Sequence, residues 1–367
     1  MRVLMISKAC IVGIYQRKLE AIARRGVDLL VLVPPSWKDE RGEIALERAF
    51  VDGYRLETVP IHLNGNFHLH FYQGIGRWMR TFRPDIVHID EEPYNFSCWQ
   101  ALYHAQRAGA KSLFFSWQNI DRAYPPPFAW GEAWVLRRVS HAIAGTDSAA
   151  AVWRSKGYRG SMSVIAQFGV DVELFQPKPA RSADHPFTIG AVARLVPEKG
   201  IDLLLRAAAK LDGAWQVRIV GGGPQRAALE ALAGELGIAA RVDFVGQVPS
   251  AHMPALIASF DVLAVPSLTR PNWKEQFGPR ATVEAMACAV PVIGSNSGAI
   301  PDVIGDAGLI VPENDVDALA AALRRLQGDS GLAAALGQRG RERALSRYTH
   351  DQVAAATVDA YHIMETG

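Results

Sequence analysis

Residues 187–205 read FTIGAVARLVPEKGIDLLL: an apolar run, a charged loop, a glycine, and a second apolar stretch at helical spacing. The run over residues 187–193 has the continuous apolar character of a strand that is buried on both faces of a sheet. We expect the chain to turn through the charged loop and to enter a helix at Ile201, directly after Gly200. A buried strand that leads into a helix is the repeating unit of a parallel α/β sheet.

The same alternation extends over almost the whole chain. It predicts an α/β fold with two Rossmann-like βαβ domains that face each other across a cleft, where ligands of such sheets usually bind. Strands are predicted at 3–7, 28–34, 84–89, 111–117 and 141–145 in the first half, and at 187–193, 216–223, 242–246, 261–267, 291–295 and 308–312 in the second; helices are predicted at 15–25, 201–211, 225–236, 254–259 and around Glu284.

The proline-rich segment 165–186 carries mixed charge and is the natural linker between the halves. We therefore expect domains at 1–170 and 171–349. The last segment, 350–367, is helical in pattern.

Composition excludes several classes of protein. Of 367 residues, 49% are apolar, which is enough for two globular cores. The 39 basic residues nearly balance the 37 acidic ones, so the net charge does not indicate a nucleic-acid partner.

Cys10, Cys98 and Cys288 are far apart in the sequence, as expected of buried thiols in a reducing compartment. The first residues lack the apolar run of a signal peptide, and we expect a cytoplasmic protein.

Two loops of the second half suggest phosphate chemistry. Arg194 and Lys199 follow a predicted strand, where their charges would suit a diphosphate, although an exposed loop with ordinary surface charges explains the same residues. The next strand ends in VGGGPQR (220–226), where Gly222 and its neighbours allow close approach of a ligand or only a tight turn. This run lacks the third glycine of a dinucleotide fingerprint, which disfavours a nicotinamide-dependent dehydrogenase.

The stretch WKEQFGPRATVEAMACAVP (273–291) holds two glutamates, Glu275 and Glu284, on either side of a Phe-Gly-Pro turn. Proline at 279 predicts a helix that begins there, and backbone N–H groups near its start would suit hydroxyl or phosphate oxygens. Carboxylates beside such a helix end are good acceptors for sugar hydroxyls. The alternative is that Glu284 is a capping or ion-paired residue and Glu275 is solvated.

Read together, ARLVPEKG, VGGGP, VDFVG, PSLTRPNWKEQFGPRATVEAMACAVPVIGS and SGAIPDVIGDAGLIVP resemble the donor half of the family-4 retaining glycosyltransferases with the GT-B fold, also called glycosyl transferases group 1. The resemblance runs in order across nearly the whole chain. It implies a C-terminal domain that binds a nucleoside-diphosphate sugar such as a UDP- or GDP-sugar, an N-terminal domain that binds the acceptor, and a C-terminal helix that returns to the first domain.

The same resemblance implies roles for individual residues. Arg194 and Lys199 would hold the diphosphate, Glu284 the ribose hydroxyls, and Glu275 the donor sugar, with Arg194, Lys199 and Glu275 as the catalytic residues. The implied reaction is a metal-independent front-face substitution without a cofactor, in which the leaving diphosphate accepts the acceptor's proton and the two cations stabilise its developing charge. The remaining donor-binding residues would be Gly13, Gly222, Gln276, Phe277, Gly278, Ser297 and Gly298.

Three features depart from the family pattern. Eight residues intervene between Glu275 and Glu284, one more than is usual, and we expect the turn to absorb the extra residue because the sequence after it keeps its helical pattern. Ala289 stands where a glycine commonly ends this helix, so an alanine in the left-handed conformation would cost about 1 kcal/mol. Gln118 stands where many relatives carry a histidine.

The acceptor side is predicted from residues that follow strands of the first half. Glu91 is a candidate acceptor contact, although an acidic turn facing solvent explains it as well. Gln118 and Asn119 could bind hydroxyls, and Trp117 could stack on a sugar, although a packed aromatic at a strand end is the more common use of tryptophan. Gly13 could approach the donor or the acceptor, or form a tight turn.

Other patterns have simpler explanations. His62, His68 and His70 alternate in IHLNGNFHLHFYQ, but no further ligand type is near, so we predict no metal site. The pair Asp315 and Asp317 is predicted to be the N-cap region of a helix rather than a metal-binding DxD. The segment RWMRTFR (77–83) permits contact with a membrane surface if the acceptor is lipid-linked, but it equally describes an ordinary amphipathic helix.

The sequence therefore predicts a retaining glycosyltransferase that moves a hexose to a hydroxyl acceptor in the synthesis of a polysaccharide or glycoconjugate. A sugar-nucleotide epimerase and an inactive relative that only binds nucleotide sugars remain the alternatives. The base, the sugar and the acceptor depend on loop shape and stay open.

Overall fold

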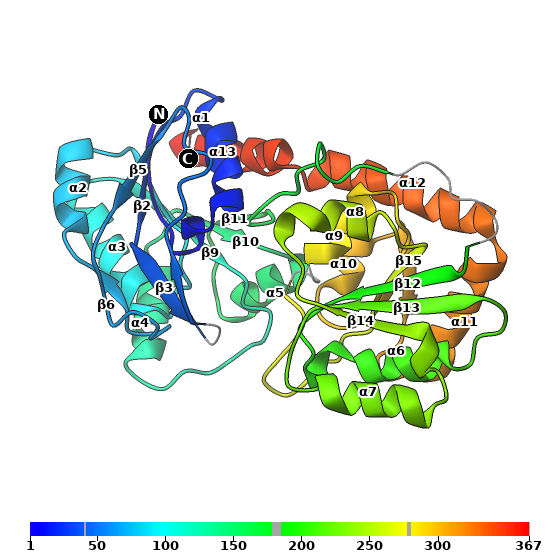
Figure 1. Ribbon diagram of the computed structural model, residues 1–367. Coiled ribbons are helices and arrows are strands. Elements are labelled where there is room, and N and C mark those ends of the chain that lie inside the picture. Colours follow the sequence, from blue (N-terminus) through cyan, green and yellow to red (C-terminus); the bar gives the residue numbers. More distant parts are fainter. Residues whose placement is uncertain (40–41, 178–184, 277–279, 367) are drawn as a thin grey trace. The chain divides into compact units, whose positions relative to one another are not determined.

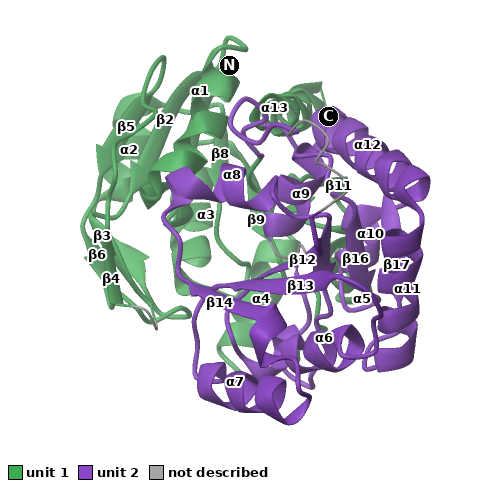
Figure 2. Ribbon diagram, turned by 45° about the vertical axis from the view of Figure 1, so that its right-hand side comes forward, with its two compact units in different colours: residues 1–169, 350–367 green, residues 170–349 purple. Residues whose placement is uncertain are grey.

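The computed structural model describes residues 1–39, 42–177, 185–276 and 280–366. The chain forms two compact units, shown in different colours in Figure 2: Met1–Gly169 with His350–Gly367, and Val170–Thr349. The first unit ends next to the boundary expected at residue 170, and the last helix belongs to it. The functions expected of the two units stay predictions.

Unit 1 is built around a parallel sheet with the strand order β11-β10-β9-β8-β1-β2-β5. The predicted strands of the first half are confirmed as β1, β2, β8, β9 and β10, whereas β5 and β11 at the two edges were not predicted. The strands are β1 (Arg2–Ile6), β2 (Asp28–Val33), β5 (Arg55–Thr58), β8 (Ile86–Ile89), β9 (Lys111–Ser116), β10 (His141–Ala144) and β11 (Ser161–Val164).

Helices cover this sheet, and small hairpins lie beside it. The helix predicted at 15–25 is wrong at both ends: it is a 3₁₀ turn over Gly13–Gln16 followed by α1 (Arg17–Ala23). Unit 1 also contains a 3₁₀ turn over Ala9–Ile11, the hairpins β3 (Ser36–Asp39) with β4 (Gly42–Ala45) and β6 (Ile61–His62) with β7 (Phe71–Tyr72), and the helices α2 (Ile75–Phe82), α3 (Phe96–Arg107), α4 (Phe128–Leu136), α5 (Asp147–Ser155) and α13 (His350–Thr366).

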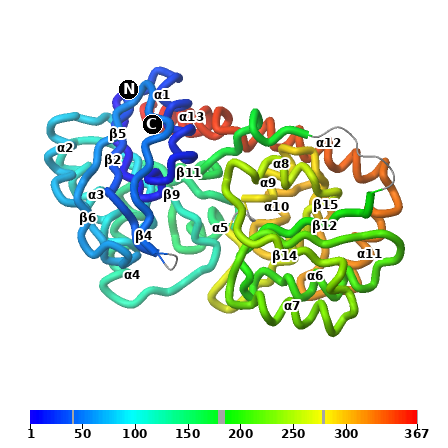
Figure 3. Tube along the Cα trace, in the orientation of Figure 1, coloured from blue at the N-terminus to red at the C-terminus, as the bar shows by residue number. Residues whose placement is uncertain are grey.

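The C-terminal helix α13 packs beside α1, so that the two ends of the chain lie in one unit (Figure 3). The hydroxyl of Tyr361 lies 2.7 Å from Nδ1 of His88, deep in the sheet, and both residues are buried. At the surface, Asp351 accepts hydrogen bonds from Arg24 and Arg25. The helix therefore completes the core of unit 1.

Unit 2 has a parallel sheet with the order β14-β13-β12-β15-β16-β17. All its strands were predicted, because each is a mainly apolar run, although the edge strands β14 and β17 are only partly buried. They are β12 (Phe187–Val192), β13 (Trp215–Val220), β14 (Val242–Gly246), β15 (Val262–Val265), β16 (Val292–Ser295) and β17 (Gly308–Val311).

Helices lie on both faces of this sheet: in Figure 1, α8 and α9 are on one side of β12 and β13, and α6 and α7 are on the other. Helix α6 begins at Ile201 as predicted but ends at Ala208, three residues before the predicted Leu211. The helices are α6 (Ile201–Ala208), α7 (Arg226–Glu235), α8 (Met253–Ile257), α9 (Arg280–Ala287), α10 (Ile300–Ile304), α11 (Val316–Gly328) and α12 (Ser330–Arg347).

Several local predictions are confirmed. Ala289, two residues after the end of α9, adopts a positive φ of 56°, which is the left-handed conformation expected of it. The side chain of Asp315 accepts a hydrogen bond from the backbone N–H of Ala318 and caps α11. All three cysteines are free and buried.

Candidate active site

The strand order of unit 2 defines where a ligand would meet the sheet. Strand β12 lies between β13 and β15, so the chain changes its direction of winding between β12 and β15. In sheets of this kind the crevice at the carboxyl ends of those strands is the usual binding site. The loop after β12 carries Arg194 and Lys199, and the loop after β15 carries Glu275. The structure therefore brings predicted site residues from distant parts of the chain to one edge of the sheet.

Lys199 and Glu275 form an ion pair at this edge. The Nζ atom of Lys199 lies 2.6 Å from Oε2 of Glu275, and the two side chains are only 11% and 9% exposed. The Ser267 hydroxyl donates to the same carboxylate oxygen at 3.0 Å, and the ring of Trp273 lies 4.8 Å from Lys199 Nζ. A cation held this rigidly is oriented before any ligand arrives, which is what electrostatic catalysis requires.

The backbone around Glu275 is fixed by the loop after β16. Ala299 donates its N–H to the carbonyl oxygen of Glu275 at 3.1 Å. Gly298 has a φ of 54°, and a Cβ atom added to it would lie 2.1 Å from that same oxygen. The predicted residue Gly298 thus has a clear local reason to be glycine: its loop packs directly on Glu275.

A second polar cluster at the same edge contains the predicted residue Ser297 together with Thr269 and Glu313, which the sequence analysis missed. The hydroxyl of Thr269 lies 3.0 Å from that of Ser297 and donates to Glu313 Oε1 at 2.6 Å. Glu313 also accepts from the backbone N–H of Thr269. Thr269 and Glu313 follow β15 and β17, so their position after predicted strands was a signal for this cluster.

The glycine loop after β13 packs on the loop that carries Arg194. Cβ atoms added to Gly221 and Gly223 would lie 2.0 Å and 2.5 Å from the carbonyl oxygens of Ala193 and Leu195. Gly222 has no such neighbour closer than 3.7 Å. Gly221 and Gly223 therefore allow the two loops to pack closely. Gly222 is not needed for this packing, and Arg194, on the other loop, is exposed.

Glu284 lies on α9 and is 6% exposed. Its Oε1 accepts a hydrogen bond from Arg280 Nε at 2.9 Å, one helical turn earlier. This is the ion-paired alternative named above, so a role in holding a ribose stays a prediction. Gln276 is exposed. Phe277, Gly278 and the predicted helix start at Pro279 lie outside the described residues.

Unit 1 has its own switch point between β1 and β8, and an ion pair lies there as well. Lys8, after β1, pairs with Glu91, after β8. Glu91 also lies 3.3 Å from His70 Nε2 and accepts from the Tyr72 hydroxyl at 2.9 Å. Burial alone would raise the pKa of Glu91, but Lys8 and His70 lower it to about 2. The Glu91 side chain is fully buried, so the predicted direct contact with an acceptor has no exposed atom to make it.

The pKa of the next residue, Glu92, is shifted in the opposite direction. Burial raises its pKa to about 7, although the Ser116 hydroxyl and the Trp117 backbone N–H donate to its carboxylate and favour the charged form. Glu92 is thus a carboxyl group that changes charge near neutral pH.

The predicted acceptor residues after β9 occupy different environments. The indole N–H of Trp117 donates to Gln167 at 2.7 Å, and a Cβ atom added to Gly145 would lie 2.1 Å from its ring, so this tryptophan is packed against the protein. Gln118 and Asn119 are buried. Gln118 donates to the Ile120 carbonyl, whereas among the described residues its buried Oε1 has no hydrogen-bond partner.

Gly13 is explained by a contact within unit 1. Its N–H donates to Glu47 Oε2 at 2.7 Å, and an added Cβ atom would lie 2.8 Å from Ala49. Its role with the donor or acceptor stays a prediction.

Two histidines of the segment 61–73 and the helix α2 have local partners within unit 1. His62 stacks on Phe71, and His70 is buried beside Glu91. Within the described part of the chain, no group of three potential metal-binding side chains was found. In α2, Met79 and Phe82 are buried in the core, as expected of an ordinary amphipathic helix. No helix among the described residues has the length and apolar character needed to cross a bilayer.

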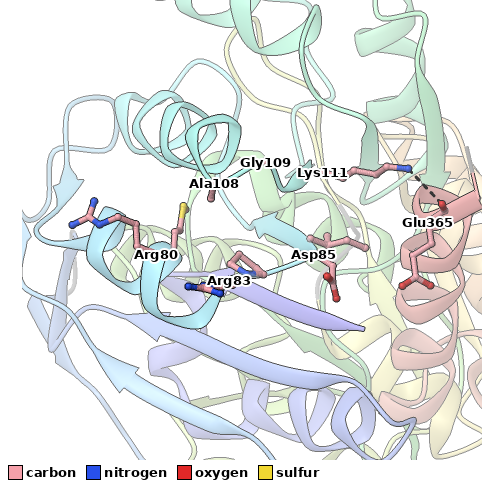
Figure 4. Close-up of a pocket in the computed structure, with 10 residues that line it drawn as sticks. Arg80, Arg83, Asp85, Ala108, Gly109, Lys111 and Glu365 are labelled. Carbon is pink, nitrogen blue, oxygen red and sulfur yellow. Dashed lines mark hydrogen bonds between the residues drawn. The ribbon is translucent and has the colours of Figure 1, made fainter.

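A pocket of about 910 Å³ opens at the opposite, amino-terminal edge of the unit 1 sheet (Figure 4). Two of its charged groups already have partners: Asp85 accepts from the Arg2 backbone N–H at 2.6 Å, and Lys111 Nζ donates to the carbonyl oxygens of Met364 and Glu365 at the end of α13. Since ligands of parallel sheets bind at the carboxyl edge, this pocket is a poorer candidate than the two switch points despite its size.

Comparison with known families covers most of the chain. Residues 173–343 match the family described as glycosyl transferases group 1, and residues 14–166 match the glycosyl transferase 4-like domain.

Among curated proteins, the chain is 38% identical over 197 residues to the GDP-mannose-dependent alpha-(1-6)-phosphatidylinositol monomannoside mannosyltransferase of Mycolicibacterium smegmatis; the match spans 49% of this chain and 51% of that relative. It is 32% identical over 264 residues to the D-inositol 3-phosphate glycosyltransferase of Mycobacterium marinum, covering 66% of this chain and 54% of the relative. The chain thus matches only about half the length of these curated relatives.

Among solved structures, the Anabaena protein Alr3699/HepE in complex with UDP has a TM-score of 0.74 at 19% identity, and the match covers 99% of this chain and 100% of the other. Sucrose-phosphate synthase from Thermosynechococcus elongatus has a TM-score of 0.73 at 22% identity and covers 100% and 99% of the two chains. The predicted GT-B fold class is confirmed.

Proposed function

The chain belongs to the glycosyl transferases group 1, and from that premise we propose that it transfers a hexose from a nucleoside-diphosphate sugar to a hydroxyl group of an acceptor. The donor binds to unit 2, and the acceptor binds to unit 1. The names of the curated relatives support this assignment, because they describe transferases that use a nucleotide sugar or add a sugar to an inositol-containing acceptor.

The ion pair between Lys199 and Glu275 is the observation that carries the proposal. It lies at the carboxyl edge of β12 and β15, where a diphosphate would approach. A charge-assisted hydrogen bond from Lys199 to a phosphate oxygen contributes about 1.5 to 3 kcal/mol, and more to a transition state whose charge is larger. The carboxylate of Glu275 accepts hydrogen bonds from the hydroxyls of the donor sugar while it holds Lys199 in place.

The proposed reaction proceeds with retention at the anomeric carbon. The bond between this carbon and the β-phosphate oxygen breaks, and the acceptor oxygen attacks from the same face. The acceptor's proton passes to the departing phosphate, so no protein base is needed. Arg194 and Lys199 stabilise the negative charge that develops on the diphosphate, and this preorganised charge is the main contribution of the protein.

The donor proposed first is GDP-mannose, because a curated relative carries that donor in its name. UDP-glucose is the second donor to test. A lipid-linked glycan and an inositol-containing metabolite are both acceptors of the proposed class.

The test begins with the thermal stability of the purified chain in the presence of GDP, UDP, ADP, NAD and the corresponding nucleotide sugars. A nucleoside diphosphate at about a hundred times its dissociation constant raises stability by about 2.7 kcal/mol, which a melting curve resolves. We expect a shift with one nucleoside diphosphate and its sugar, and slow release of that sugar from the donor in the absence of acceptor. A shift with NAD alone, or with no nucleotide, would contradict the proposal.

Variants then separate an enzyme from a binding protein. Lys199→Met is expected to lower the rate of sugar release by two orders of magnitude or more. The control is Lys210→Met, which also removes a lysine paired with a carboxylate, Asp317, but at an exposed place after α6. An epimerase would convert the donor sugar without releasing it, and an inactive relative would bind the donor and leave it intact.

A further inference from the structure

Lys8 has no role in the site assignments above, and it lies in a cluster of aromatic and charged side chains. It follows β1 at the carboxyl edge of the unit 1 sheet, beside the loop after β8. Its Nζ atom pairs with Glu91 and lies 4.8 Å from the ring centre of Phe67 and 5.5 Å from that of Trp37. We call Lys8, Trp37, Phe67, His70 and Glu91 the Lys8 cluster.

The inner side of the Lys8 cluster is rigid. Besides Lys8, the carboxylate of Glu91 is contacted by His70, Tyr72 and Asn95 Nδ2, the last at 3.5 Å. Trp37 packs edge-on against His70 with the ring centres 4.9 Å apart. The ammonium group therefore has one position, set by side chains behind it.

The outer side of the cluster is accessible. The Phe67 side chain is 41% exposed, Trp37 is half-buried, and Lys8 retains 15% of its side-chain exposure. Among the described residues, Lys8 Nζ donates its hydrogen bond to Glu91, and an ammonium group has three donors. The partly exposed Lys8 side chain thus lies beside two aromatic rings, and its ammonium group has donors beyond the one that pairs with Glu91.

The charge of the cluster favours a neutral ligand over an anion. Glu91, with a pKa of about 2, is ionised and offsets the charge of Lys8. Asp90 and Glu92 flank Glu91 in the sequence and belong to the same loop. A phosphate would meet little net positive charge here, whereas a neutral hydroxyl needs only a fixed donor.

We propose that the Lys8 cluster is a binding subsite for a neutral, hydroxylated ring of the acceptor, such as a sugar or a cyclitol. Lys8 donates hydrogen bonds to ring hydroxyls, and Phe67 and Trp37 pack against the C–H face of the ring. Glu91 is a positioning residue that acts through Lys8, in place of the direct acceptor contact predicted from the sequence. This inference rests on the proposed function, because it treats unit 1 as the acceptor unit.

The test is ligand-observed saturation-transfer NMR with two probes at millimolar concentration, methyl α-D-mannopyranoside and myo-inositol. Lys8→Met alone would leave the buried Glu91 carboxylate without its cation, so the variant is the double substitution Lys8→Met with Glu91→Gln, which removes both charges. Phe67→Ala is a second, independent variant on the exposed side of the cluster. We expect both to weaken binding of at least one probe about tenfold or more.

Lys156→Met with Glu132→Gln is a matched control. Lys156 also pairs with a glutamate, Glu132, and also lies over two aromatic rings, those of Tyr124 and Trp153, but it belongs to the end of α5 and not to the Lys8 cluster. This control is expected to bind the probes as the wild type does.

The outcomes are distinct. Equal binding by the wild type and both variants, or no saturation transfer to the wild type from either probe, overturns the inference. Displacement of the bound probe by equimolar inorganic phosphate overturns the choice of a neutral ligand. Donor-induced thermal shifts, which report on Lys199 in unit 2, test the proposed function separately, so that either proposal can fail without the other.

Discussion

Gly298 packs directly on Glu275: a Cβ atom on residue 298 would lie 2.1 Å from the carbonyl oxygen of Glu275 and 2.9 Å from its backbone nitrogen. The two residues belong to the loops after β16 and β15. Gly298 also has a φ of 54°, a region that side-chain-bearing residues rarely adopt. The position of the Glu275 carboxylate therefore depends on a glycine that is remote from it in the sequence.

Gly298→Ala is expected to shift the Glu275 backbone, separate its carboxylate from Lys199, and weaken donor binding at least tenfold, since one charge-assisted hydrogen bond is worth about 1.5 to 3 kcal/mol. Isothermal titration with the donor that gives a thermal shift measures this loss. Gly234→Ala in α7 is the control, because an added Cβ atom meets nothing within 4 Å there. Unchanged donor affinity in Gly298→Ala would show that the contact with Glu275 does not position the site.

Ala289→Gly is expected to stabilise unit 2. Ala289 has a φ of 56°, and an alanine in this left-handed conformation destabilises the folded state by about 1 to 2 kcal/mol, a strain that glycine does not have. Glycine, however, has more conformational freedom in the unfolded chain, which offsets up to about 1 kcal/mol of this gain in stability. The net gain of about 0.5 to 1 kcal/mol should raise the melting temperature by about 1–4 °C. Differential scanning calorimetry measures the shift.

The matched control for this variant is Ala285→Gly, four residues earlier and within α9. There the same substitution should destabilise by about 1 kcal/mol, because a helix interior disfavours glycine. A melting temperature that falls in both variants would mean that the backbone at residue 289 is not strained.

Most of the strands that the sequence predicted are mainly apolar runs that are buried in the sheet, although the predicted edge strands β14 and β17 are only partly buried. The strands it missed are polar or short. The edge strands β5 and β11 read RLET and SMSV, and β3 reads SWKD. A strand that is open to solvent on one side can carry polar residues, and these three strands therefore lack a continuous apolar run. A mainly apolar run, and not strand formation itself, made the prediction possible.

The candidate site shows a similar limit. Lys199 and Glu275 were found because their residue types and places after strands match a family pattern. The pairing of Lys8 with Glu91 was missed because it joins residues 83 positions apart, and their adjacency depends on β1 lying next to β8 in the sheet. Pairs of this kind follow from strand order, which the sequence alone does not determine.

Glu91 and Glu92 are adjacent in the chain, yet their pKa values are displaced in opposite directions. The pKa of Glu91 is lowered to about 2, so its ionised form stabilises the folded state above pH 4.5 and this stabilisation is lost as the pH falls toward 2. The pKa of Glu92 is raised from 4.5 to about 7 by burial, so its contribution is largest below pH 4.5 and is lost as the pH rises through 7.

Glu92→Gln should therefore change the pH dependence of stability in one window. Between pH 4.5 and 7, Glu92 of the wild type is protonated in the folded state and ionised in the unfolded state. The free energy of unfolding therefore falls with rising pH by up to about 1.4 kcal/mol per pH unit, or on the order of 1 to 3 kcal/mol in total. Glutamine has the same shape as glutamate but does not titrate. The stability of the variant relative to the wild type should therefore increase as the pH rises from about 5 to about 8. Parallel melting curves of the two proteins measure the difference, with Asp52→Asn, a change at an exposed carboxylate, as the control. If the difference between Glu92→Gln and the wild type stays constant over that range, Glu92 is charged throughout, and burial does not govern its titration.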